Sequence, residues 1–148
     1  MRVREAQKGE SHMKQAATLT TASLLTILFM TFHLTGDILF RMAPAGLVNL
    51  LAVFIFVVQL YGTLVLGGRR AGYIIIFLGS ALALVVPVVH MKGTRGVIGG
   101  DIGTSSQAFL FVWTILALGI TATFSVILSA SALLSLPWRR SRRASPAA

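Results

Sequence analysis

The sequence contains no cysteine and very few acidic residues. Its 148 residues include only 4 Asp or Glu, against 13 Lys or Arg. The absence of cysteine excludes disulfide bonds, thiolate catalysis and cysteine-ligated metal sites in this chain, and with them the membrane thiol–disulfide oxidoreductases. Charged residues make up 11% of the chain, whereas an average soluble domain has about 25%. This composition is not that of an ordinary globular protein.

The sequence is instead rich in long runs without a charged side chain. Four such runs each reach the roughly 20 apolar residues that a helix needs to cross about 30 Å of hydrocarbon. Backbone groups find no hydrogen-bond partners in lipid, so spanning segments of this kind are helical, whereas a membrane barrel shows short alternating strands. We therefore predict an all-α integral membrane protein with four transmembrane helices in an up-down bundle. The predicted spans are about residues 18–40, 46–66, 71–91 and 107–134.

The basic residues are distributed unevenly around these spans. With a cytoplasmic N-terminus, ten of the 13 Lys and Arg residues lie on the inner side and three on the outer side. Cytoplasmic segments of membrane proteins carry such an excess, so the sequence predicts both termini in the cytoplasm and a bacterial inner membrane. The chain then divides into a polar N-terminal tail (1–14), a multi-pass transmembrane domain (15–138) and a basic C-terminal tail (139–148).

The same charge pattern predicts the partners of the protein. Basic segments beside a bilayer attract anionic lipid headgroups, at about 1 kcal/mol per residue near the surface. We expect the lipid bilayer, and no nucleic acid, to be the partner of this +9 chain. A homo-oligomer or a larger membrane complex is compatible with the sequence. Residues 43–45 imitate a signal-peptide cleavage site, but the preceding apolar run is longer than the about 7–15 residues of a signal peptide, so we expect an uncleaved anchor.

A few ionisable and strongly polar residues interrupt the apolar spans. His33 and Asp37 are four residues apart and therefore share one helix face. Counting about 1.5 Å per residue from the middle of each span places His33 about 6 Å and His90 about 13 Å outward of the midplane. Asn49 falls in the same half of the membrane. Because such residues usually face the bundle, the sequence predicts a buried polar cluster of His33, Asp37, Asn49 and His90.

Two of the predicted helices carry a stripe of small residues. Helix association in lipid depends on close backbone packing, which small side chains permit. We expect both stripes to face the interior of the bundle. His90 belongs to the stripe of the third span and should therefore point inward as well. The stripes are Ala117, Thr121, Ser125 and Ser129 in the last span, and Gly72, Gly79, Ala83, Pro87 and His90 in the third.

Several interpretations of the polar cluster stay open. In the structural one, Asp37 accepts hydrogen bonds from His33 or His90. In the second, His33 and His90 ligate haem iron, or bind copper together with Met30 and Met91, since imidazole and thioether are ligands that copper accepts. In the third, His33 and Asp37 form a proton relay in a small proton-coupled transporter. Hydrolysis at the membrane surface is a fourth, but no nucleophile is visibly paired with a base.

The sequence favours a non-enzymatic function over these sharper alternatives. The glycine-rich segment at residues 92–106 lacks the Gly-Lys-Ser/Thr of a nucleotide-binding loop, so it predicts no phosphate site. We expect a small polytopic inner-membrane protein without a cofactor, acting as an accessory subunit or interaction protein. Binding of haem or copper at His33 and His90 is the main alternative.

Overall fold

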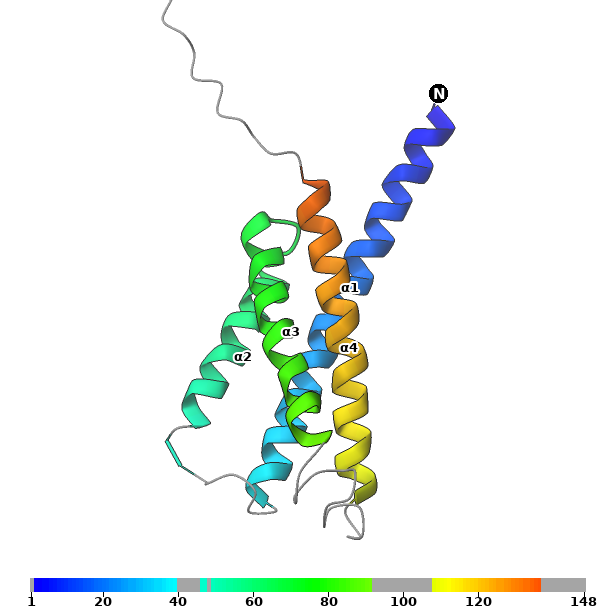
Figure 1. Cartoon of the computed structure of the whole chain (residues 1–148). Coiled ribbons are helices and arrows are strands. Elements are labelled where there is room, and N and C mark those ends of the chain that lie inside the picture. The colour runs from blue at the N-terminus through cyan, green and yellow to red at the C-terminus, as the bar shows by residue number, and fades with distance from the viewer. Residues whose placement is uncertain (1, 40–45, 48, 92–107, 137–148) are drawn as a thin grey trace, which may run out of the picture.

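The structure is a computed structural model that describes residues 2–39, 46–47, 49–91 and 108–136. Within these residues the protein is entirely helical, without a strand, which confirms the predicted all-α class. The helices are α1 (Arg2–Leu39), α2 (Asn49–Leu64), α3 (Arg70–Met91) and α4 (Ala108–Ser135) (Figure 1).

Three of the helices contain segments long and apolar enough to cross a membrane. These segments are Gly9–Leu39, Arg70–Met91 and Phe109–Ser135. The fourth helix, α2, has 16 residues and is equally apolar, but it extends only about 24 Å against the about 30 Å of a hydrocarbon core. The part of the chain that the structure describes therefore has three to four helices long and apolar enough to span a membrane.

The turn after α2 explains why this helix ends before the predicted boundary at residue 66. The N–H groups of Val65 and Leu66 both donate to the carbonyl oxygen of Tyr61, at 2.9 and 3.2 Å. Gly68 follows with a φ of 77°, a conformation that glycine adopts without the steric cost of a Cβ. A short turn of this kind makes α2 and α3 antiparallel neighbours.

The first helix is longer than predicted. It begins at Arg2, so residues 2–14, which the sequence assigned to a separate polar tail, continue α1. The 38 residues of α1 extend for about 57 Å. Figure 1 shows its amino-terminal part leaving the other helices. An exposed ion pair between Lys14 Nζ and Glu10 Oε1, at 2.7 Å, spans one turn of this part.

The four helices run alternately in opposite directions (Figure 1). The α3–α4 contact is the most extensive, α1 packs mainly against α4, and α2 packs mainly against α3. The carboxyl ends of α1 and α3 and the amino end of α4 consequently lie together, at the lower end of Figure 1.

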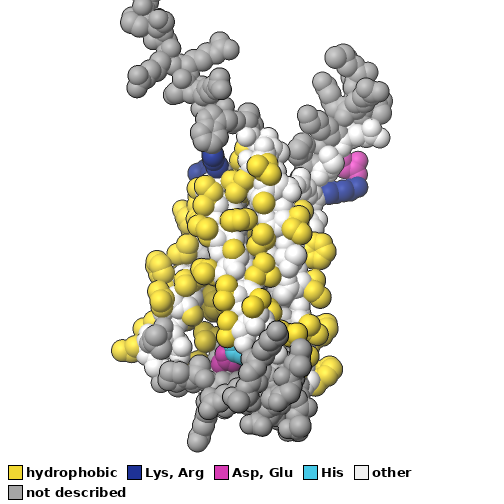
Figure 2. Space-filling view, viewed as in Figure 1, with side chains coloured by type: hydrophobic (Ala, Val, Ile, Leu, Met, Phe, Trp, Pro, Cys, Tyr) yellow, Lys and Arg dark blue, Asp and Glu magenta, His cyan; other side chains and the backbone are white. Residues whose placement is uncertain are grey.

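Large apolar side chains cover the outer surface of the helices. Figure 2 shows them as a yellow surface over most of the helices' length, with a small acidic and histidine patch at its lower end. Exposed examples include Phe54, Leu82 and Phe124. An apolar surface of this extent is disfavoured in water and is typical of helices that face lipid.

A layer of polar side chains joins three helices inside the structure. Ser23 Oγ lies 2.8 Å from Thr63 Oγ1. The amide of Gln59 donates to Ser80 Oγ at 3.4 Å and to Ser23 Oγ at 3.5 Å. Because all four side chains are buried, these bonds connect α1, α2 and α3 where water cannot compete.

The fourth helix joins this layer through its small residues. Thr26 Oγ1 on α1 lies 3.4 Å from Ser125 Oγ on α4. Ser125 and Ser129 are fully buried, Ala117 is nearly so and Thr121 is partly buried, in agreement with the predicted inward face of α4. On α3, Gly72 and Ala83 are likewise buried.

An apolar layer separates these polar residues from the end of the helices where α1 and α3 finish. Its centre is the buried cluster of Ala83, Leu118 and Ala122. Phe29 and Met30 of α1 pack against this cluster. His33, one turn further along α1 than Met30, therefore lies on the far side of an apolar layer from Ser23 and Thr26.

Candidate metal centre

Three ionisable side chains meet at the end of the helices. His33 and Asp37 lie in the last two turns of α1, and His90 is the last residue but one of α3. His33 Nε2 is 3.4 Å from Asp37 Oδ2, and His90 Nε2 is 3.7 Å from the same oxygen. Both imidazoles thus approach one carboxylate oxygen. Both distances exceed the about 2.7–3.2 Å of an ordinary hydrogen bond.

The His33 imidazole is buried without a hydrogen-bond partner. The side chain is only 4% exposed, and neither Nδ1 nor Nε2 has a partner among the described residues. Asp37 Oδ1 is buried and unpartnered in the same way. A buried polar group left unpaired costs about 1–3 kcal/mol, so three such atoms in one place call for a ligand that satisfies them.

His90 is held by its own helix. Its Nδ1 donates to the carbonyl oxygen of Val86 at 3.0 Å. That bond places the hydrogen of a neutral imidazole on Nδ1 and leaves Nε2 with a lone pair directed at Asp37. Metal-ligating histidines almost always have such an outer hydrogen bond, which sets the tautomer and the ring orientation.

Aromatic rings pack closely around the two histidines. The ring centroids of His33 and His90 are 4.7 Å apart, with the rings nearly perpendicular at 88°. The ring of Phe111, from the first turn of α4, lies 5.5 Å from His33 and 5.7 Å from His90. The ring of Phe111 and the packed helices limit the access of water to His33 and His90.

The three groups have the arrangement of a small cation site. One ligand atom of each of His33, Asp37 and His90 lies within 4.8 Å of the others. Metal–ligand bonds of about 2.0–2.1 Å in a tetrahedral zinc site separate neighbouring ligand atoms by about 3.3 Å. The observed 3.4 and 3.7 Å are close to that separation. Two imidazoles and one carboxylate are also the protein ligands of known catalytic zinc and non-haem iron sites.

The structure brings the two histidines closer than the sequence predicts. Their estimated depths differed by about 7 Å, yet the rings are in edge contact. The estimate counted residues from the middle of each predicted span, which ignores the tilt and the relative offset of α1 and α3. The prediction that His90 points inward with the small face of α3 agrees with this contact.

The structure does not test the other predicted ligands. Met30 packs against the apolar layer, and Met91, the last residue of α3, is 36% exposed. Asn49 is the first residue of α2, where its N–H donates to Gly46 O at 3.0 Å. Their roles in the site stay predictions. The sequence also places Arg41 four residues after Asp37, within reach of an ion pair on one helix face, but Arg41 lies outside the described residues.

The histidine geometry favours a small ion over haem. Axial ligation by two imidazoles requires both rings to face each other across a porphyrin plane. Here both Nε2 atoms approach one carboxylate oxygen instead, and the ring centroids are only 4.7 Å apart.

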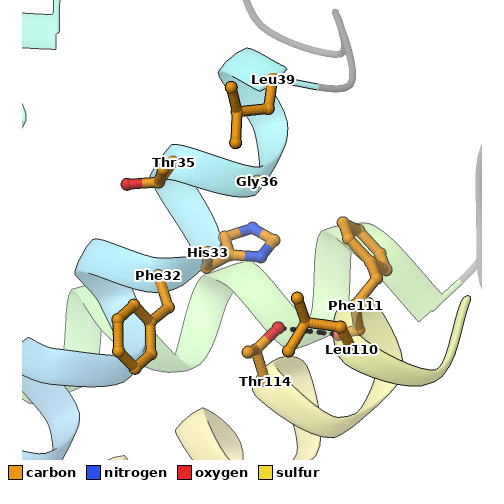
Figure 3. A pocket seen from close by; sticks show the side chains of 8 residues that line it. All are labelled: Phe32, His33, Thr35, Gly36, Leu39, Leu110, Phe111 and Thr114. Carbon is orange, nitrogen blue, oxygen red and sulfur yellow. Dashed lines mark hydrogen bonds between the residues drawn. The ribbon is translucent and has the colours of Figure 1, made fainter. Parts of the chain in front are cut away.

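A cavity of about 250 Å³ adjoins the cluster between α1 and α4. Figure 3 shows the His33 ring among the side chains that line it, with Phe32 on one side and Phe111 and Leu110 on the other. The sequence did not predict this cavity or the contact of Phe111, because both depend on how α4 packs against α1.

Comparison with protein-family models, with curated proteins and with solved structures finds no match to this chain.

Proposed function

We propose that this helical membrane protein binds one divalent transition-metal ion at His33, Asp37 and His90. The observation that carries the proposal is the convergence of three ligand atoms within 4.8 Å, at a place where His33 has no hydrogen-bond partner among the described residues. An ion would accept the lone pairs of both Nε2 atoms and of the carboxylate at once. It would also offset the negative charge of Asp37, which is only 13% exposed.

The ligand set favours a borderline divalent ion such as Zn²⁺, Co²⁺ or Fe²⁺. Imidazole and carboxylate suit these ions, whereas Cu⁺ prefers thiolate or thioether sulfur. Copper held by Met30 and Met91 has less support, because Met30 packs against the apolar layer. Three protein ligands leave a fourth position open for water or another molecule, as in catalytic zinc sites.

The test is metal uptake by the whole protein purified in detergent. Co²⁺ is a suitable probe, because its visible absorption reports its coordination, and Zn²⁺ should displace it. We expect saturation at one ion per chain and equal stoichiometry for Zn²⁺ measured by elemental analysis. Uptake that does not saturate, or a protein that binds neither ion, would contradict the proposal.

A proton relay through the protein has less support. The polar layer around Gln59 and the cluster at His33 are separated by apolar side chains centred on Ala83 and Leu118. A chain of hydrogen bonds from one end of the helices to the other would have to cross that layer.

We further propose that the helices form an up-down transmembrane bundle in a bacterial inner membrane, with both termini cytoplasmic. The alternating helix directions and the excess of basic residues on one side support this orientation. In such a membrane the metal cluster lies in the outer half, and the protein acts as an accessory subunit or interaction protein of a larger membrane complex.

Reporter fusions test the orientation. A reporter enzyme that works only in the cytoplasm should be active when it is fused after Ala148. A reporter that works only after export should be active when it is inserted near Gly99. Activity of each reporter on the opposite side would reverse the proposed orientation.

A further inference from the structure

The two histidines of the cluster are held in different ways. His90 has an outer hydrogen bond, from Nδ1 to the carbonyl oxygen of Val86 at 3.0 Å. The His33 imidazole has no such bond, because neither of its nitrogens has a partner among the described residues. Histidines that bind a metal are almost always oriented by a hydrogen bond at the nitrogen that does not face the ion. Within the part of the chain that the structure describes, only packing can orient His33.

Two rings pack against the His33 imidazole. The His90 ring meets it nearly at a right angle, with the centroids 4.7 Å apart. The Phe111 ring lies 5.5 Å away and is tilted by 49° (Figure 3). Aromatic rings attract each other at centroid separations of about 4.5–7 Å. A rotation of the imidazole about its Cβ–Cγ bond would disturb both contacts and move Nε2 away from Asp37 Oδ2, which is 3.4 Å distant.

Phe111 is suited to hold the imidazole because its own position is fixed. Its side chain is only 3% exposed. It lies in the first turn of α4, where its carbonyl oxygen accepts a hydrogen bond from Thr114 Oγ1 at 2.9 Å. The helix α4 packs extensively against both α1 and α3. The Phe111 ring also lies 5.7 Å from the His90 ring, so it contacts both imidazoles of the cluster.

We infer that Phe111 is a positioning residue of the metal site, whose ring holds the His33 imidazole with Nε2 directed at Asp37. The inference rests on the proposed function, since it assumes that this nitrogen binds the ion. Packing against Phe111 takes the place of the outer hydrogen bond that His90 has. A ligand that is already in its binding orientation loses less conformational freedom when the ion binds, so the affinity is higher. The helix α4 contributes in this way to a site whose three ligand atoms come from α1 and α3.

Replacement of Phe111 with leucine tests the inference in the whole protein, purified in detergent. Leucine keeps an apolar side chain on α4 but offers no flat ring to the imidazole. We expect the affinity for Co²⁺ to fall about tenfold or more, as for other outer-shell partners of metal ligands. The visible spectrum of bound Co²⁺ should change as well, because the position of His33 changes. Phe109→Leu is the matched control, since Phe109 lies in the same turn of α4 but is 81% exposed, and its affinity should be unchanged.

A second measurement needs no variant. In NMR spectra of the metal-free protein with labelled histidine and phenylalanine, we expect one set of ring signals for His33. These signals should show cross-peaks to the ring protons of Phe111. Two exchanging sets of His33 signals, or missing cross-peaks to Phe111, would overturn the inference even if Phe111→Leu did not fold.

The outcomes separate this inference from the metal site itself. Equal Co²⁺ affinity in Phe111→Leu and Phe109→Leu would overturn the inference and leave the metal site intact. A lower Tm of Phe111→Leu with unchanged Co²⁺ affinity and spectrum would show a structural role alone, and would overturn the inference in the same way. Failure of the unmodified protein to take up any ion would overturn the proposed function, and the inference with it.

Discussion

Replacing His33 with alanine is expected to weaken Co²⁺ and Zn²⁺ binding by about 100-fold or more. Changes to outer-shell partners of metal ligands already cost about 10–100-fold, and His33 is itself a proposed ligand. Its Nε2 lies 3.4 Å from Asp37 Oδ2, so alanine removes one of the three proposed ligand atoms. The measurement is a competition titration of the purified variant against the unmodified protein.

Thermal stability distinguishes the metal site from a purely structural role. A ligand that binds only the folded protein stabilises it by about 2.7 kcal/mol when its concentration is 100 times Kd. We expect metal to raise the Tm of the unmodified protein and to leave that of His33→Ala unchanged. In the structural interpretation, His33→Ala would instead lower the Tm of the metal-free protein, and metal would have no effect on either form.

Two control variants sharpen the result. His12→Ala removes the third histidine of the chain and should leave metal affinity unchanged. Met30→Leu keeps an apolar side chain of similar volume at the apolar layer and should also bind metal normally. A loss of affinity in Met30→Leu as large as in His33→Ala would instead favour the copper site with methionine ligands.

Gly72→Ala is expected to have the largest effect on folding. A Cβ at this position would overlap the carbonyl oxygen of Leu66 and lie 2.8 Å from the carbonyl oxygen of Gly62. Both obstacles are backbone atoms of the α2–α3 hairpin and cannot rotate away. Overpacking costs about 1–3 kcal/mol and occasionally more, so we expect Gly72→Ala to lose about 3 kcal/mol of stability, despite alanine's higher helix propensity.

Unfolding of the purified protein in detergent measures this loss. Gly119→Ala is the control, because its nearest neighbour would be Pro87 Cγ at an ordinary 3.5 Å. Gly62→Ala should also lower the midpoint, since its Cβ would lie 2.6 Å from Ile75 Cγ2, which can rotate, and 2.9 Å from Ile75 Cβ, which cannot. Equal unfolding midpoints for Gly72→Ala and Gly119→Ala would show that α2 and α3 do not pack as described.

The ranking of these effects follows from which atoms are able to relax. His33 is proposed to share one metal ion with the side chains of Asp37 and His90, so the effect of its replacement appears mainly in metal binding. At Gly72 the neighbours are backbone, so the change appears in stability alone. The two variants therefore report on the site and on the fold independently.

The sequence was sufficient for the helical class and for the apolar character of the helices. Charge-free runs of sufficient length specify helices in lipid whatever their neighbours, because the backbone bonds are local. It also indicated the inward face of α4, through the spacing of Ala117, Ser125 and Ser129. The same periodicity placed His33 and Asp37 on one face of α1, because residues four apart are adjacent on any helix.

Only the tertiary structure decided what these residues meet. The relative offset and tilt of α1 and α3 brought His90 against His33, where counting residues had separated them by about 7 Å. The cavity beside Phe111 and the link from Gln59 to Ser80 also depend on contacts between helices. Local spacing sets the direction of a side chain from its own helix axis, but the partner that it reaches depends on how the helices pack.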